Sequence, residues 1–86
     1  MTRIRIKSLI WDDFNIIHSG IHGVAKKEIE AGIRQVRYHR HTYNKRYLVV
    51  CESEKRTITI IVSRKSLNTY YVISARQANK KEKKKI

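Results

Sequence analysis

Residues 70–86 read YYVISARQANKKEKKKI, and they pass from an apolar strand into a basic tail. The first six residues alternate between two faces and are rich in β-branched and aromatic side chains, which predicts a β-strand. After Arg76 apolar residues nearly vanish, and lysines surround a single acid, Glu82. Asn79 precedes Glu82 by three residues, the spacing of a capping box, so we predict that a short helix begins at Asn79. A helix of roughly seven residues is marginal alone in water, so it must dock on the body of the protein or on a partner, or fray.

The whole chain shares the positive charge of this tail. Its 20 Lys and Arg residues outnumber 7 Asp and Glu residues, and the formal net charge is +13. Charge of this size destabilises a compact fold by self-repulsion, so it indicates an anionic partner. Nucleic acid fits best, because neutralised phosphates release counterions and give affinity without any particular sequence. An acidic protein is the alternative partner. A membrane surface is not expected, because the chain has no long basic amphipathic helix.

Length and cysteine content limit the fold and the compartment. A chain of 86 residues predicts one domain, residues 1–86, with a small core. No apolar run approaches the ~20 residues of a membrane-spanning helix, and the first residues lack the apolar stretch of a signal peptide. The single cysteine, Cys51, permits no internal disulfide and lies in an apolar run, so we interpret it as a buried hydrophobe rather than a nucleophile. These features are typical of a cytoplasmic protein.

Two helices are predicted after a short N-terminal strand. Residues 3–9 alternate basic with apolar side chains, which predicts a strand with one solvated face. Asp12 or Asp13 can cap the first helix. Its inward face is expected to consist of the apolar residues at positions i, i+3 and i+7, namely Phe14, Ile17 and Ile21. A second helix is predicted from about Ala25. Its inward face is expected to contain Val24, Ile29 and Ile33.

Four further strands are predicted at residues 35–43, 47–52, 57–63 and 69–75. The first of these has no apolar face and is expected at an edge of the sheet, whereas the apolar run Ile60–Val62 predicts a central position for the third. Asn44-Lys45 is expected to form a turn. The elements together predict an α+β fold in the order β-α-α-β-β-β-β-α. Two N-terminal helices would pack on a four- to five-stranded antiparallel sheet, followed by a short basic C-terminal helix.

The four histidines could carry chemistry. His18 and His22 lie four residues apart, a spacing that places two imidazoles on one helix face for a metal ion. No third ligand is apparent, so we interpret both as structural and predict neither a metal nor a cofactor. His39 and His41 project from one strand face, and imidazole titrates near neutrality, as general acid–base catalysis requires. A solvated or stacked role is the alternative for this pair.

The composition restricts the kind of nuclease that this chain could be. Seven acids argue against a two-metal site of clustered carboxylates. The remaining chemistry is metal-independent cleavage of RNA, in which the 2′-hydroxyl attacks and cations neutralise the phosphorane. Arginine suits this task because its planar guanidinium grips phosphate oxygens in a bidentate way. Arg46, Arg64 and Arg76 lie at strand starts or ends, where they can converge over one face of the sheet. For each of them alone, a solvated surface role is the alternative.

Residues 11–30 read WDDFNIIHSGIHGVAKKEIE, and residues 72–85 read VISARQANKKEKKK. These two stretches resemble motifs of BrnT-like toxins, of the RelE/ParE toxin superfamily. The first is similar to the signature W-D-x-x-N-I-x-H-I-x-x-H-G-V-x-x-x-E. The second is similar to the motif V-I-S/T-A-R-x-A/M-T-x-x-E-x-x-x-Y. Between them the strand pattern also agrees, as does an arginine before the second sheet strand, Arg46. The resemblance thus spans nearly the whole chain.

The resemblance implies a compact α+β ribonuclease of a type II toxin–antitoxin system, which inhibits translation by cutting RNA. It also implies a cognate ribbon-helix-helix antitoxin, with operator DNA bound only through the toxin–antitoxin complex. By the same similarity, the candidate active-surface residues are Arg64, Arg76, Glu82 and the Lys80–Lys85 tail. The chain departs from the family pattern at several positions: Ala25 in place of Ser or Thr, Cys51 in place of Gly, Asn79 in place of Thr or Ser, and Ile86 in place of the closing Tyr.

The leading interpretation is therefore an endoribonuclease toxin. Arg46, Arg64 and Arg76 would stabilise the phosphate, and His22 or His39 would transfer protons. The residues expected to bind nucleic acid are Arg37, Arg40, Lys80, Lys81, Lys83 and Lys84. The alternative is a basic module that binds nucleic acid, an antitoxin or another partner without catalysis.

Overall fold

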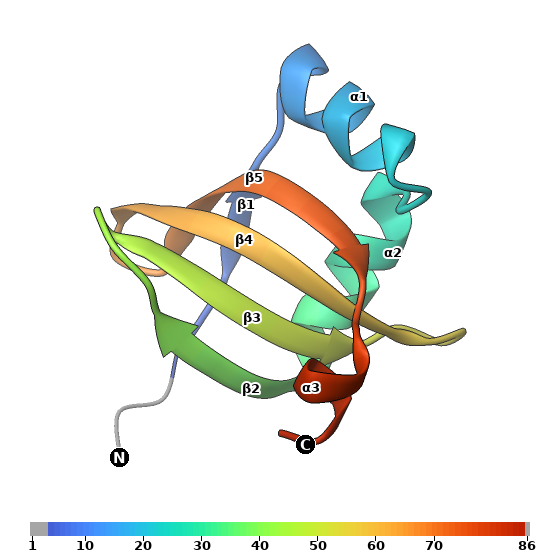
Figure 1. Cartoon of the computed structure of the whole chain (residues 1–86). Coiled ribbons are helices and arrows are strands. Elements are labelled where there is room, and N and C mark those ends of the chain that lie inside the picture. Colours follow the sequence, from blue (N-terminus) through green and yellow to red (C-terminus); the bar gives the residue numbers. More distant parts are fainter. Residues whose placement is uncertain (1–3, 86) are drawn as a thin grey trace.

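A five-stranded sheet is the frame of the computed structural model, which describes residues 4–85 (Figure 1). In chain order the elements are β1 (Ser8–Ile10), α1 (Asp13–Ile21), α2 (Lys26–Gly32), the 3-10 turn η1 (Ile33–Gln35), β2 (Val36–His41), β3 (Arg46–Glu52), β4 (Thr57–Ser66), β5 (Thr69–Gln77) and α3 (Lys80–Lys83). The order of strands across the sheet is β1-β5-β4-β3-β2. The predicted α+β class and order of elements are confirmed. So are the edge position of β2 and the central position of β4.

The sheet is mixed rather than antiparallel, because β1 runs parallel to β5 while the other neighbouring pairs are antiparallel. The prediction of a purely antiparallel sheet was wrong in this respect. Alternation of side chains identifies a strand but not its partner, and β1 pairs with the last strand of the chain. The first strand is also shorter than predicted, since residues 4–7 are irregular. Arg3 lies outside the described residues.

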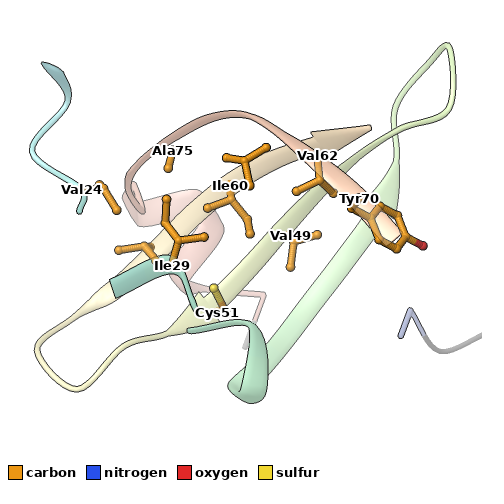
Figure 2. Packing of buried hydrophobic residues seen from close by; sticks show 10 residues of the cluster. Val24, Ile29, Val49, Cys51, Ile60, Val62, Tyr70 and Ala75 are labelled. Carbon is orange, nitrogen blue, oxygen red and sulfur yellow. The ribbon is translucent and has the colours of Figure 1, made fainter. Parts of the chain in front are cut away.

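The main core lies between α2 and one face of the sheet (Figure 2). Val24 and Ile29 are buried there, as predicted, and they pack against apolar side chains from β3, β4 and β5. Cys51 is fully buried in this cluster, and burial raises the pKa of its thiol to about 12. The burial of Cys51 confirms its interpretation as a buried hydrophobe. The raised pKa agrees with it, because such a thiol forms little thiolate at neutral pH.

Short turns with left-handed residues connect β2 to β3 and β4 to β5. Asn44 and Lys45 have φ angles of 49° and 61°, and they form the predicted turn between β2 and β3. Asn68, with a φ of 65°, lies in the turn between β4 and β5. Asparagine tolerates this conformation better than most residues because its side chain hydrogen-bonds locally.

Helix α1 begins as predicted, but the face that it packs against the rest of the protein is not the predicted one. Asp12 is the N-cap, and it exchanges hydrogen bonds of 2.8 Å with Asn15 in a capping box. The apolar side chains expected to point inward are exposed instead: Phe14 by 70%, Ile17 by 63% and Ile21 by 74%. That prediction was wrong.

The buried face of α1 is polar because it completes the end of strand β1. Asn15 is fully buried, and its side-chain amide donates to the backbone carbonyls of Ile10, at 2.9 Å, and Val72, at 3.0 Å. These carbonyls lie where β1 ends beside β5. A buried carbonyl without a donor costs about 1–3 kcal/mol, so their need for donors decides how the helix is rotated.

An ion pair fixes the hairpin between β3 and β4 to α2. The guanidinium of Arg56 donates to both carboxylate oxygens of Glu28, at 2.8 and 2.9 Å, and to the carbonyl of Gly23 at 2.6 Å. The Ser53 hydroxyl adds a 2.8 Å bond to the same carboxylate. The hydrogen bond from Arg56 is the main reason that the pKa of Glu28 lies below its ordinary value of 4.5.

Replacing Glu28 by Gln should therefore change the acid sensitivity of the fold. A carboxyl whose pKa is lowered on folding stabilises the protein above its ordinary pKa, and this contribution is lost as the pH falls through the lowered value. We expect Glu28→Gln to lower the free energy of unfolding by about 1–3 kcal/mol at pH 7. The difference from the parent protein should shrink at about pH 3.5. Urea denaturation of both proteins at the two pH values measures it, and an equal difference at both would contradict the expected linkage.

Two glycines in helices provide a matched test of packing. A Cβ atom on Gly32 would lie 2.9 Å from Cys51 Sγ and 3.3 Å from Ile58 Cδ1, whereas one on Gly20 would meet no atom within 4 Å. We expect Gly32→Ala to destabilise the fold by about 1–3 kcal/mol, because the buried neighbours must shift. Gly20→Ala should stabilise dilute protein by up to ~1 kcal/mol through helix propensity. Thermal denaturation compares the stabilities of the two variants. Equal stability would show that the close packing at position 32 does not require a glycine.

Candidate nucleic-acid interface

Helix α3 covers the face of the sheet opposite α2 (Figure 1). Side chains alternate along β3, so Val49 and Cys51 belong to the core under α2 while Leu48 and Val50 point to the other face. Leu48 and Val50 are nevertheless buried, and so is Thr59 on the neighbouring strand. The basic C-terminal segment therefore docks on the sheet rather than fraying into solvent.

The carboxylate of Glu82 anchors this short helix. As predicted, Asn79 is the N-cap, and its backbone N–H donates to Glu82 Oε1 at 2.9 Å. The same oxygen accepts from Thr59 Oγ1 at 2.9 Å and from Arg76 Nη1 at 2.8 Å, while Oε2 accepts from Arg76 Nη2 at 2.6 Å. The Arg76 guanidinium is thus committed to Glu82 by a bidentate ion pair.

The two charged groups of this pair each favour the ionised form of the other. Burial alone raises the pKa of Glu82, but the hydrogen bonds from Arg76, Asn79 and Thr59 outweigh it and leave that pKa below its ordinary value. The hydrogen bond to Glu82 raises the pKa of Arg76. The pair therefore stays charged at neutral pH and holds α3 in one position on the sheet.

A cleft of about 340 Å³ lies between α3 and strands β2 and β3. It combines three cationic side chains with an aromatic ring and an apolar floor, and Lys85 Nζ lies 5.9 Å from the centre of the Tyr38 ring. Cations can neutralise phosphates, and an aromatic face can stack on an unpaired base, so this set suits single-stranded nucleic acid. The lining residues are Tyr38, Arg40, Leu48, Asn79, Lys81, Glu82 and Lys85.

Two of the six predicted nucleic-acid-binding residues line this cleft, and three others lie on α3 or directly after it. Arg40 and Lys81 line the cleft. Three further predicted lysines are exposed on α3 or directly after it: Lys80, Lys83 and Lys84. Arg37 does not line the cleft. It lies near the start of β2, where its guanidinium is 3.6 Å from the carboxylate of Glu52.

The three arginines predicted to converge lie on both faces of the sheet. Arg46 and Arg76 share the face of α3, since Arg46 follows the alternation of Leu48 and Arg76 pairs with Thr59. Arg46 donates to the hydroxyl of Tyr43 at 3.3 Å. Arg64 pairs with buried Tyr70 and lines a separate hollow, of about 260 Å³, on the face of α2. The expectation that the three arginines form one pocket was wrong.

Neither histidine proposed for proton transfer lies in the cleft. His22 caps the C-terminal end of α1, where its ring packs edge to face against His18 with centroids 5.4 Å apart. His39 lines the hollow with Arg64, and its Nε2 accepts a hydrogen bond of 3.2 Å from the backbone N–H of Ile4. Because Nε2 accepts this bond, the ring proton of a neutral His39 is on Nδ1. Nδ1 is then an N–H donor and cannot act as a base.

Neither a metal-binding cluster nor a membrane-spanning helix occurs among residues 4–85. Within this range no three His, Cys, Asp or Glu side chains gather closely enough to hold a metal ion. His18 stacks on Phe14 with centroids 5.9 Å apart, in keeping with a structural role for this histidine. No helix in the same range is long and apolar enough to cross a membrane.

Tyr38 and Leu48, which line the cleft, and Thr59, which holds α3, were not identified as site residues from the sequence. Tyr38 shares a predicted strand face with Arg40, and this alternation was the available signal for an aromatic residue among cations. Lys85 lies in the predicted basic tail. Leu48 and Thr59 gave no signal, because only the long-range pairing of β3 and β4 and the docking of α3 bring them to the site.

The fold is similar to that of a protein of known structure. No family model matches the chain, and no curated protein matches its sequence. Among solved structures, the crystal structure of the Brucella abortus ribonuclease toxin BrnT, at 1.1 Å resolution, superposes with a TM-score of 0.67. The match covers 85% of this chain and 97% of that chain at 21% sequence identity. The chain therefore has a BrnT-like toxin fold, as the two end motifs implied.

Proposed function

We propose that the protein is an endoribonuclease toxin of a type II toxin–antitoxin system and that it binds RNA in the cleft beside α3. The observation that carries the proposal is the cleft itself, in which Arg40, Lys81 and Lys85 surround Tyr38. The likeness in fold to a ribonuclease toxin supports the same activity.

The cleft can perform the positioning and charge stabilisation that RNA cleavage needs. Phosphates of a single strand would bind Arg40, Lys81 and Lys85, and a base would stack on Tyr38. A strand held in this way can present its 2′-hydroxyl in line with the scissile bond, and the cations offset the charge that builds on the phosphorane. Arg46 lies on the same face and can contact the next phosphate. No step in this scheme uses a metal ion.

Arg76 acts as a positioning residue in this proposal. Its two Nη atoms are bound to Glu82, so the guanidinium holds α3, and with it Lys81 and Lys85, against the sheet. The residues that line the cleft include no histidine, and we therefore assign neither His22 nor His39 to proton transfer there.

The partner that fits the proposal is an antitoxin of the ribbon-helix-helix type, encoded with the toxin and acting in the cytoplasm. An acidic segment of such a partner could occupy the basic cleft and exclude RNA. Operator DNA would be bound by the antitoxin part of the complex. Translation would be inhibited when the free toxin cuts RNA.

A binding module without catalysis is the second candidate. It is favoured by the composition of the cleft, whose lining residues include cations and an aromatic ring but no histidine. Both candidates bind RNA in a salt-dependent way, so salt titration does not separate them. Analysis of the products does, because ends that carry a 2′,3′-cyclic phosphate form only when the RNA is cut.

Removing the cations of the cleft should slow cleavage. We expect purified protein to cut single-stranded RNA in EDTA, and Arg40→Ala or Lys81→Ala to lower the cleavage rate at least about ten-fold, or ~1.4 kcal/mol in barrier. Lys27→Ala on α2 removes the same charge far from the cleft and is the control. Product gels at matched protein concentration measure the rates. Unchanged cleavage by both cleft variants would contradict the assignment of the site, and a parent protein that binds RNA but forms no cyclic-phosphate ends would favour the binding module.

A double-mutant cycle should reveal how Arg76 acts. If Arg76 works by holding Glu82, then Arg76→Ala and Glu82→Ala should each lower cleavage at least about ten-fold, and the double variant should lose no more than either one. Both variants should also become more sensitive to trypsin at Lys80–Lys85, since α3 would be released. Additive losses, or a Glu82→Ala protein that cleaves normally, would instead place Arg76 directly on the phosphate.

A further inference from the structure

Helix α1 presents an apolar stripe to solvent, formed by Phe14, Ile17 and Ile21. Each of these side chains is exposed by more than half, and they follow one another along a single face of the helix. Single exposed apolar residues are common on protein surfaces, but a contiguous row of large ones is typical of an interaction site. The α1 stripe lies at the other end of the molecule from α3, so it is separate from the proposed RNA cleft (Figure 1).

A glycine lies on the same side of the helix as the stripe. Gly20 follows Ile17 by three residues, and a Cβ atom built on it would meet nothing within 4 Å. Glycine inside a helix costs about 0.5–1 kcal/mol relative to alanine, and no close contact within the chain requires it at this position. The missing side chain leaves room for the close approach of a second backbone.

The distribution of charge indicates what can approach this surface. No lysine or arginine occurs between Ser8 and Ala25, although the chain contains 20 of them, and this segment carries two acids, Asp12 and Asp13. The next basic residue, Lys26, lies over the ring of Trp11, 5.7 Å from its centre. An acidic partner would be attracted to the α3 face instead. Two copies of a molecule of charge +13 repel each other least where α1 meets α1.

We propose that α1 is the interface of a homodimer, in which two copies pack their α1 stripes against each other about a two-fold axis and approach most closely at Gly20. A two-fold contact uses the same patch twice, so one row of apolar residues with a glycine in it is sufficient for both partners. The dimer leaves both α3 clefts facing outward. This inference does not depend on the proposed ribonuclease activity.

Salt should distinguish this dimer from any association through nucleic acid. The contact is apolar, and the two copies repel each other over longer distances, so added salt screens the repulsion and strengthens the dimer. Copies that are bridged by RNA, or an acidic partner bound to the cleft, would dissociate under the same change.

The test is sedimentation equilibrium of the full chain, freed of nucleic acid, at about 10–200 μM protein and at about 0.1 and 0.5 M NaCl. We expect a dimer whose dissociation constant falls at the higher salt concentration. Ile17→Asp should raise that constant at least about ten-fold, because it buries a charge in the contact. Gly20→Ala should also raise it, while leaving the fold of dilute protein at least as stable.

The control is Leu67→Asp, which places the same charge at another largely exposed apolar residue, in the turn between β4 and β5. This variant should dimerise like the parent protein. Circular dichroism establishes that each variant is folded before its mass is measured. A parent protein that stays monomeric at every concentration and salt would overturn the proposal, as would an Ile17→Asp protein that dimerises normally.

Discussion

The carboxylate of Glu82 is the contact on which the candidate site depends. A helix of four residues has almost no stability of its own, so α3 keeps its place only through its bonds to the sheet. Glu82 accepts hydrogen bonds from a strand hydroxyl, from its own N-cap and from Arg76. Removing a carboxylate from water is costly unless its oxygens are satisfied, and here both are. An acidic residue, Glu82, therefore fixes the position of the lysines that line one wall of the cleft.

The same need for satisfied polar groups explains the exposed face of α1. Burying a large apolar side chain contributes about 1.5–3 kcal/mol, so rotating the stripe inward would be favourable on that ground alone. Such a rotation would remove the Asn15 amide from the carbonyls of Ile10 and Val72 at the end of β1. It would also break the capping box with Asp12. The polar groups of Asp12 and Asn15 are satisfied within the chain, while the apolar face can still be buried by a second molecule.

Features that depend on neighbouring residues could be predicted from the sequence. The caps at Asp12 and Asn79, the turn at Asn44 and the inward position of Ile29 all follow from local spacing, and each is confirmed. The direction of β1 and the buried face of α1 could not be predicted in this way, because both depend on pairing with a strand more than 50 residues away.

The placement of the arginines was only partly accessible from the sequence. Arg64 has the same parity as Ile60 and Val62 on β4, and this alternation alone places it on the face of the main core. For Arg76 the pattern was insufficient, because β5 shifts its register against β4 between Val72 and Ser74. A strand irregularity of this kind reverses the expected face of every residue that follows it.

The α3 cleft and the hollow that Arg64 lines with His39 differ in what their aromatic rings can do. In the hollow of Arg64, Tyr70 is almost fully buried and meets Tyr47 edge to face, while Tyr47 meets His41 in the same way. Rings that are packed into each other in this manner hold the sheet together but offer no free face to a base. In the cleft of α3, the Tyr38 ring meets only the ammonium of Lys85 among the aromatic and cation contacts of the described residues. A ring next to exposed cations on an edge strand can accept a nucleobase. The ability to stack, more than the positive charge that both hollows share, therefore distinguishes the α3 cleft from the hollow of Arg64.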